Sequence, residues 1–73
     1  MSPVASAQIA TARELVREFH AISPAAAVEY VARLRKTAED FVANEPGTKL
    51  THAFSLTAVA AEAALKEASG GAL

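Results

Sequence analysis

Residues 50–68 read LTHAFSLTAVAAEAALKEA, and this stretch contains neither proline nor glycine. Seven of its nineteen residues are alanine and only three carry a formal charge. Alanine has the highest helix propensity because it loses no side-chain entropy when a helix forms. The stretch therefore predicts a single helix, and its excess of apolar surface implies that more than one of its faces must be covered.

Two opposite apolar faces are predicted for this helix. At about 100° per residue, the expected core face consists of Leu50, Phe54, Thr57, Ala61, Leu65 and Ala68. The second face, called here the outer ridge, repeats at i, i+4, i+7 and i+11 and consists of His52, Leu56, Val59 and Ala63, with Ala60 on its flank. The remaining polar strip is narrow and consists of Thr51, Ser55, Glu62 and Lys66. Because two helices do not readily cover so much circumference, we expect the outer ridge to contact another chain or to lie exposed.

Proline, glycine and capping residues divide the chain into three helices, expected at residues 3–21, 24–44 and 49–69. Serine precedes proline at Ser2 and again at Ser23. Serine is a favoured N-cap residue and proline is favoured at the first helical position, so each pair predicts the start of a helix. The breaker cluster at 44–48 ends the second helix, with Thr48 or Thr51 available to cap the third. Two glycines at 70–71 end the third helix.

The expected fold class is all-α. Connections of about two and four residues force neighbouring helices to be antiparallel, which favours an up-down-up three-helix bundle. A helical hairpin whose third helix is completed by oligomerisation is the main alternative. The first helix should bury Val4, Ala5, Ile9, Ala12, Leu15, Val16, Phe19 and Ile22, and the second should bury Ala27, Val31, Leu34, Ala38, Phe41 and Val42. Among these and the third helix, we expect Phe19, Leu34, Phe41 and Phe54 to form the main core.

Length and composition set further limits. Seventy-three residues make one domain, 1–73, whose stability is marginal at this size and would gain from association. A net charge of −1 gives no electrostatic reason to expect nucleic acid or an anionic membrane as partner. Without cysteine, no disulfide or thiolate zinc site can form. The first residues lack the pattern of a secretory signal, so the expected location is the cytoplasm.

No catalytic or cofactor motif emerges from the sequence. His20 and His52 should lie at opposite ends of an up-down-up bundle and lack metal-site spacing, so no metal is expected. Tyr30 is best interpreted as a residue at the edge of the core, although tyrosine can ligate haem iron. Ser55 lies in an F-S-L stretch without the aspartate of a phosphopantetheine site and without a triad. We therefore expect no enzyme and no cofactor.

Arg35 is unusual because it projects between Val28 and Val42, beside the apolar face of its helix. Its guanidinium must either extend into water or meet an acceptor, for example as an interface anchor. Together with the outer ridge, it supports a non-catalytic protein that binds protein, as a homo-oligomer or as a regulatory or accessory subunit. The predicted partner-binding residues are His52, Leu56, Val59, Ala60, Ala63 and Arg35. The alternative is a helical bundle that binds a small apolar ligand or cofactor at an oligomer interface.

Overall fold

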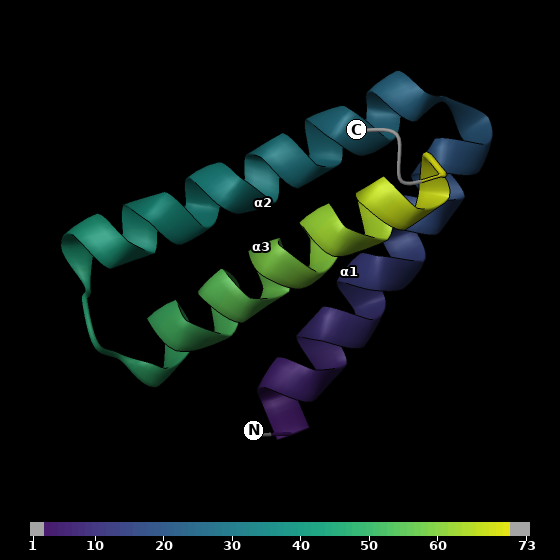
Figure 1. The fold of residues 1–73 in the computed structure, drawn as a ribbon. Helices are drawn as coiled ribbons and strands as arrows, with labels where there is room; N and C mark the ends of the chain where they lie inside the picture. Colours follow the sequence, from purple (N-terminus) through teal and green to yellow (C-terminus); the bar gives the residue numbers. More distant parts are fainter. Residues whose placement is uncertain (1–2, 71–73) are drawn as a thin grey trace.

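The structure is a computed structural model that describes residues 3–70. Within this range the chain forms three helices and no strand: α1 spans Pro3–Ile22, α2 spans Pro24–Asn44 and α3 spans Lys49–Ala68 (Figure 1). Each helix packs against both of the others. The prediction of an all-α three-helix bundle is therefore confirmed, and the predicted helix ends are at most one residue from those observed.

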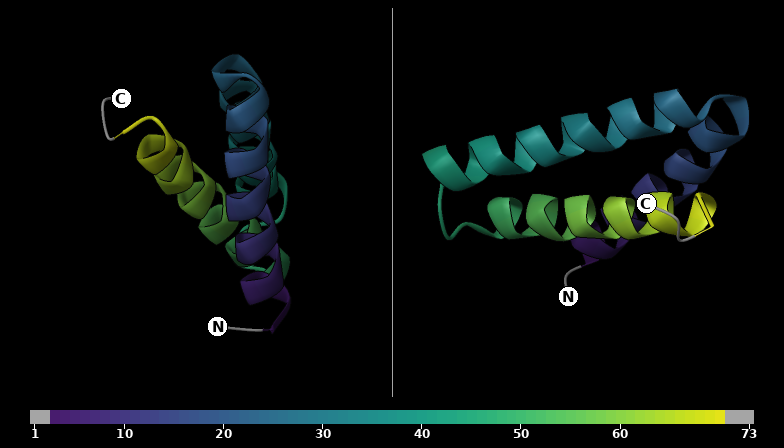
Figure 2. Two further views of the ribbon diagram at one scale, coloured as in Figure 1. Left: turned by 90° about the vertical axis from the view of Figure 1, so that its right-hand side faces the viewer. Right: turned by 45° about the horizontal axis from the view of Figure 1, so that its top comes forward.

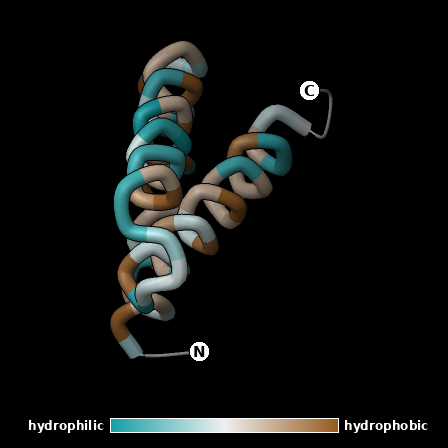
Figure 3. Tube along the Cα trace, turned by 90° about the vertical axis from the view of Figure 1, so that its left-hand side faces the viewer, coloured by the Kyte–Doolittle hydropathy of each residue, from teal (hydrophilic) through white to brown (hydrophobic). Residues whose placement is uncertain are grey.

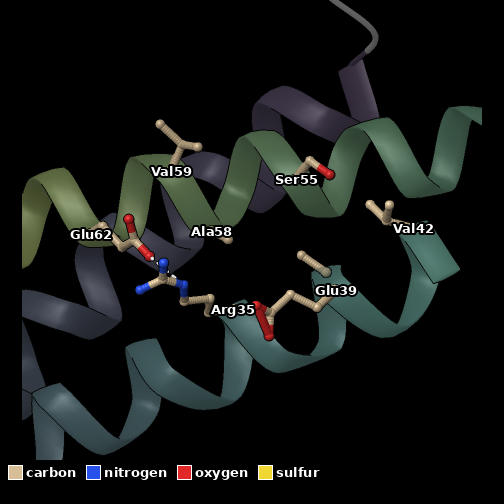
Figure 4. Close-up of a pocket in the computed structure, with 8 residues that line it drawn as sticks. Arg35, Glu39, Val42, Ser55, Ala58, Val59 and Glu62 are labelled. Carbon is tan, nitrogen blue, oxygen red and sulfur yellow. Dashed lines mark ion pairs between the residues drawn. The ribbon is translucent and has the colours of Figure 1, made fainter.

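The helices form a two-helix layer with the third helix on one side of it. α2 and α3 run antiparallel and side by side, and α1 crosses α3 at an angle (Figure 1, Figure 2). The molecule extends 34 Å along its longest axis. Because α1 packs on one side of the α2–α3 layer only, the opposite face of that layer is open within residues 3–70 (Figure 4).

The first turn is made by Ser23 and Pro24. Ser23 is extended, with φ −161° and ψ 123°, and its carbonyl oxygen accepts hydrogen bonds from the backbone N–H groups of Ala26 and Ala27. Ser23 is therefore the N-cap residue of α2, as predicted, although its side chain makes no capping hydrogen bond. The proline at the first helical position loses nothing by lacking an N–H, since that group has no partner inside a helix. The expected cap Ser2 and the glycine Gly71 lie outside the described residues.

The second turn depends on a glycine and two threonines. Gly47 adopts a φ of +81°, which is accessible to glycine without steric cost. Thr48 caps α3, because its hydroxyl oxygen accepts from the backbone N–H of Thr51 at 3.1 Å. The Thr48 hydroxyl donates to that of Thr51 at 2.8 Å, and the Thr51 hydroxyl donates to the carbonyl of Glu45. The assignment of Thr51 to the polar strip is therefore wrong: the residue is buried, with its hydroxyl satisfied by the loop.

The core is built mainly from alanine. The buried apolar residues are Ala5, Ala12, Val16, Ala27, Val31, Ala38, Ala53, Ala58, Ala61, Ala64 and Leu65. Val16 is the largest side chain that is completely buried. Phe19 and Leu34 pack against this core but remain half-buried, as do Phe41 and Phe54. Small side chains allow the helices to approach closely, and the large side chains predicted as the main core lie at its margin.

Several residues expected on the buried faces are exposed instead. Val4 and Ile22 lie at the two ends of α1, and Leu50 lies in the first turn of α3. Because α1 crosses α3 at an angle, the helix ends have no neighbour to cover them (Figure 2). Val42 is exposed for a different reason, since it faces the open side of the α2–α3 layer.

Hydrophobic segments recur along the length of α3, separated by short hydrophilic ones (Figure 3).

Candidate functional site

An open groove of about 370 Å³ runs between α2 and α3 on the face that α1 does not cover (Figure 4). The groove is lined by four residues of α2 and four of α3: Arg35, Ala38, Glu39, Val42, Ser55, Ala58, Val59 and Glu62. Alanines form the part nearest to the core, and longer side chains form the two walls. We call this groove and its walls the α2–α3 face.

The two walls have the same helical spacing. On α2 the wall repeats at 35, 39 and 42, and on α3 it repeats at 55, 59 and 62, which is i, i+4, i+7 in both cases. Since the helices are antiparallel, the first residue of one wall lies opposite the last of the other. Arg35 accordingly meets Glu62 across the groove, and Val42 lies near Ser55 (Figure 4).

An ion pair spans the groove. The Nε of Arg35 lies 3.5 Å from Oε1 of Glu62, and the two side chains are 68% and 43% exposed. Exposed pairs of this kind contribute only about 0–1 kcal/mol to stability because water screens them. A third charged residue of the same face, Glu39, makes no ion pair with any residue between 3 and 70. The face therefore presents charges that the fold itself hardly uses.

Apolar side chains accompany these charges on the same face. Val59 is 65% exposed and Val42 is 51% exposed. Val28 is 50% exposed and precedes Arg35 by seven residues, so it belongs to the same stripe of α2. Single exposed apolar residues are ordinary, but Val42 and Val59 line one groove together with two alanines, and an apolar surface of this kind is typical of interaction sites.

The structure distributes the six predicted partner-binding residues unevenly. Arg35 and Val59 both line the groove, so the structure brings these two together across α2 and α3. His52 is exposed in a neighbouring hollow at the second turn, which it lines with Thr48, Thr51 and Ser55 and which shares Ser55 with the groove. Ala63 is exposed, whereas Leu56 and Ala60 are half-buried, and none of these three lines the groove. Their role in partner binding stays a prediction.

The sequence predicts Arg35 between Val28 and Val42 but does not identify the rest of the α2 wall or the partner of Arg35. Glu39 and Val42 line the groove beside Arg35, and neither is among the predicted binding residues. The i, i+4, i+7 spacing of 35, 39 and 42 could have identified both. Glu62 could not have been identified as the acceptor for Arg35, because the pairing depends on the packing of α2 against α3.

A second, smaller hollow lies where α1 meets α2. It is lined by Phe19, Tyr30 and three other residues of these helices, and the rings of Phe19 and Tyr30 are 5.2 Å apart at 44°. Burial raises the pKa of the Tyr30 hydroxyl above 10.0, because the charged phenolate loses contact with water. Within residues 3–70, no three histidine, aspartate or glutamate side chains are grouped so that they could hold a metal ion. No helix in this part of the chain is long and apolar enough to cross a bilayer.

Comparisons of the chain with models of protein families, with curated proteins and with solved structures found no match. The fold and the α2–α3 face thus define the class: a small three-helix bundle with one open, mixed apolar and charged face.

Proposed function

We propose that this protein is a non-catalytic helical module that acts by binding protein through the α2–α3 face. It would do so as a homo-oligomer, as an accessory or regulatory subunit of a larger assembly, or as both. The observation that supports this proposal most directly is the exposure of Val59 and Val42 together on the one face that no helix of residues 3–70 covers.

The alanine-rich core also supports the proposal, because it contributes little hydrophobic free energy to folding. Burying a large aliphatic or aromatic side chain contributes roughly 1.5–3 kcal/mol, and alanine contributes much less because it removes less apolar area from water. With Val16 as the largest completely buried side chain, the isolated bundle has a small hydrophobic driving force. A partner that covers Val59 and its neighbours would add apolar burial that the fold alone lacks.

The open face also has the composition of a binding surface. Protein interfaces combine an apolar centre with a polar rim, and arginine is enriched in them. Here the valines and groove alanines supply the apolar part, and Arg35 supplies an exposed guanidinium. Acid, base and nucleophile do not converge in the groove: Ser55 lines it without a histidine among the lining residues. The chemistry on this face favours recognition over catalysis.

The test replaces one exposed valine on the face and one elsewhere. Val59→Glu introduces a charge into the proposed contact, whereas Val4→Glu introduces the same charge at an equally exposed valine in the first turn of α1. Because both sites are exposed, circular dichroism should show the same helix content for both variants and the wild type. We expect Val59→Glu alone to lose self-association in light scattering, or to lose a protein that copurifies with the wild type.

Equal behaviour of the two variants would contradict the proposal. If Val59→Glu and Val4→Glu retain the same assembly and the same copurifying proteins as the wild type, the α2–α3 face does not bind protein. A wild type that is monomeric and copurifies with nothing in its native host would contradict it as well.

A further inference from the structure

We infer that the α2–α3 face binds a second copy of this chain, with α2 of each copy lying over α3 of the other. The inference deepens the proposed function and rests on it, since it names the partner of the same face. The arrangement has a two-fold axis that lies in the plane of the face and runs parallel to α2 and α3. The two layers then form a four-helix core with one α1 on each outer side.

The geometry follows from the antiparallel layer. Rotation about an axis parallel to the helices exchanges the positions of α2 and α3 without shifting either along its length. Each α2 therefore has an antiparallel α3 beside it in its own chain and a second antiparallel α3 in the other copy. Four-helix bundles with short connections use the same antiparallel contacts between neighbouring helices.

The charges of the face fit this arrangement. Because the rotation preserves height along the helices, Arg35 of each copy faces Glu62 of the other, as well as Glu62 of its own chain. Two arginines and two glutamates then alternate around the centre of the core. Within one chain the Nε of Arg35 lies 3.5 Å from Oε1 of Glu62, and the Arg35 side chain is 68% exposed. A guanidinium has five N–H donors, so this exposed group can also bind a second carboxylate side-on.

The face carries little net charge. The charged residues that line the groove are Arg35, Glu39 and Glu62, which together have a net charge of −1. Lys66 follows Glu62 by four residues and Val59 by seven, so helical spacing places it on the same flank of α3, beyond the groove. Two copies of a weakly charged face approach each other with little overall repulsion, whereas a strongly charged face would exclude itself as a partner.

The available area is sufficient for a dimer of modest affinity. Two helices of roughly 10 Å diameter along a 34 Å molecule present a face of about 600–700 Å². A standard interface buries about 800 Å² on each partner, so the face approaches this size. Apolar contact would come from the valines: Val42 of one copy lies opposite the stretch of α3 that carries Ser55 and Val59 of the other.

Charge reversal across the groove tests the arrangement. Arg35→Glu places glutamates at all four central positions of a homodimer, and Glu62→Arg places arginines at all four. We expect each variant alone to associate at least about tenfold more weakly than the wild type, because like charges in a contact cost several kcal/mol. An equimolar mixture of the two variants should recover a heterodimer, since glutamates of one chain then face arginines of the other.

The control reverses the same charge on the outer side of α2. Arg33 pairs with Glu29 at 2.7 Å on the solvent-exposed surface, two residues from Arg35. Arg33→Glu changes the net charge as Arg35→Glu does, and it should dimerise like the wild type. Light scattering and analytical ultracentrifugation over about 1 µM to 1 mM would cover the range of affinities expected for this area. Circular dichroism confirms that each variant is folded.

The outcomes separate this inference from the proposed function. A monomeric wild type overturns the second copy as partner, but the proposed function stands if Val59→Glu loses a copurifying protein that Val4→Glu retains. If Arg35→Glu weakens the dimer no more than Arg33→Glu does, the proposed arrangement is overturned. It is also overturned if the mixture of Arg35→Glu and Glu62→Arg does not recover association. If the wild type dimerises and neither Val59→Glu nor Arg35→Glu weakens the dimer, both the proposed function and the proposed arrangement are overturned.

Discussion

Phe41 of α2 and Phe54 of α3 stack with their ring centroids 4.7 Å apart and 12° between the ring planes. Both rings are only half-buried, because α1 does not extend to the α2–α3 turn (Figure 1, Figure 2). At this end the hairpin has no third helix to pack against. The stacked rings of Phe41 and Phe54 are therefore the main apolar contact between α2 and α3 near their connection, where α1 does not reach.

Replacement of Phe41 by alanine should lower the free energy of unfolding by about 2–3 kcal/mol. The estimate lies below the 3–5 kcal/mol typical of a fully buried phenylalanine because this ring is partly in water. Phe41→Leu removes the stacking but keeps much of the apolar area, so it should cost about 1 kcal/mol. Urea denaturation measures both values. An unchanged midpoint for Phe41→Ala would mean that the stack contributes nothing to the fold.

The hydroxyl of Thr51 should be worth about 1–3 kcal/mol. Thr51→Val keeps the shape of the side chain but removes the shorter of the two hydroxyl contacts to the carbonyl of Glu45, leaving only that of Thr48 at 3.4 Å, and removes the acceptor for the hydroxyl of Thr48. Thr51→Ser keeps the hydroxyl and should be considerably less destabilising. Thermal unfolding of the two variants compares them directly, and a Thr51→Val protein as stable as Thr51→Ser would show that the loop does not depend on this hydrogen bond.

The fold could be predicted because its signals are local. The helix ends are marked by the proline at the first position of α1 and of α2, and by the breaker cluster at 44–48. Helical periodicity places Ala61 on the buried face of α3, and the structure buries it completely. The exposed pairs of Glu29 with Arg33 and of Lys36 with Asp40 are equally local, because i,i+4 neighbours meet on any regular helix.

The tertiary relations could not be predicted in the same way. Periodicity gives the buried face of a helix but not the crossing angle of its neighbour, so the exposure of Ile22 and Leu50 at helix ends was missed. Side-chain size predicts that the phenylalanines form the main core. In the structure the helices pack so closely that the small alanines are buried between them, and the phenylalanines lie at the margin of the core. Helical periodicity places Thr51 on the polar strip, and its burial depends on a hydrogen bond to Glu45 in the preceding loop, which the pattern of α3 alone does not predict. The ion pair of Arg35 with Glu62 depends on the register between α2 and α3.

Alkaline pH should destabilise the protein through Tyr30. Burial raises the pKa of this hydroxyl above its ordinary 10.0, so the folded state prefers the neutral phenol. The resulting contribution to stability is fully present below pH 10 and is lost as the pH rises through the higher pKa of the folded state. Tyr30 is the only tyrosine, so tyrosinate absorbance reports its titration alone. We expect a midpoint above 10.0 in the folded protein.

Tyr30→Phe provides the control for this prediction. The variant keeps the ring against Phe19 but has no proton to lose, so the part of the alkaline destabilisation due to Tyr30 should disappear. A Tyr30 midpoint equal to that of the urea-unfolded chain would show that the hydroxyl is as hydrated in the folded protein as in the unfolded one.

Two alanines of α3 should respond in opposite ways to the same enlargement. Ala61 is completely buried between the helices, so Ala61→Leu should cost about 1–3 kcal/mol or more of folding free energy by overpacking. Ala63 is exposed on the outer ridge, so Ala63→Leu should change the free energy of unfolding of the isolated chain by no more than about 0.5 kcal/mol. If the outer ridge binds protein through close packing, the same substitution should nevertheless weaken association by steric clash. Urea denaturation at low protein concentration and light scattering at high concentration separate the two effects. Stronger association of Ala63→Leu would instead indicate that the added apolar area outweighs the clash, and that the contact at this position is loosely packed.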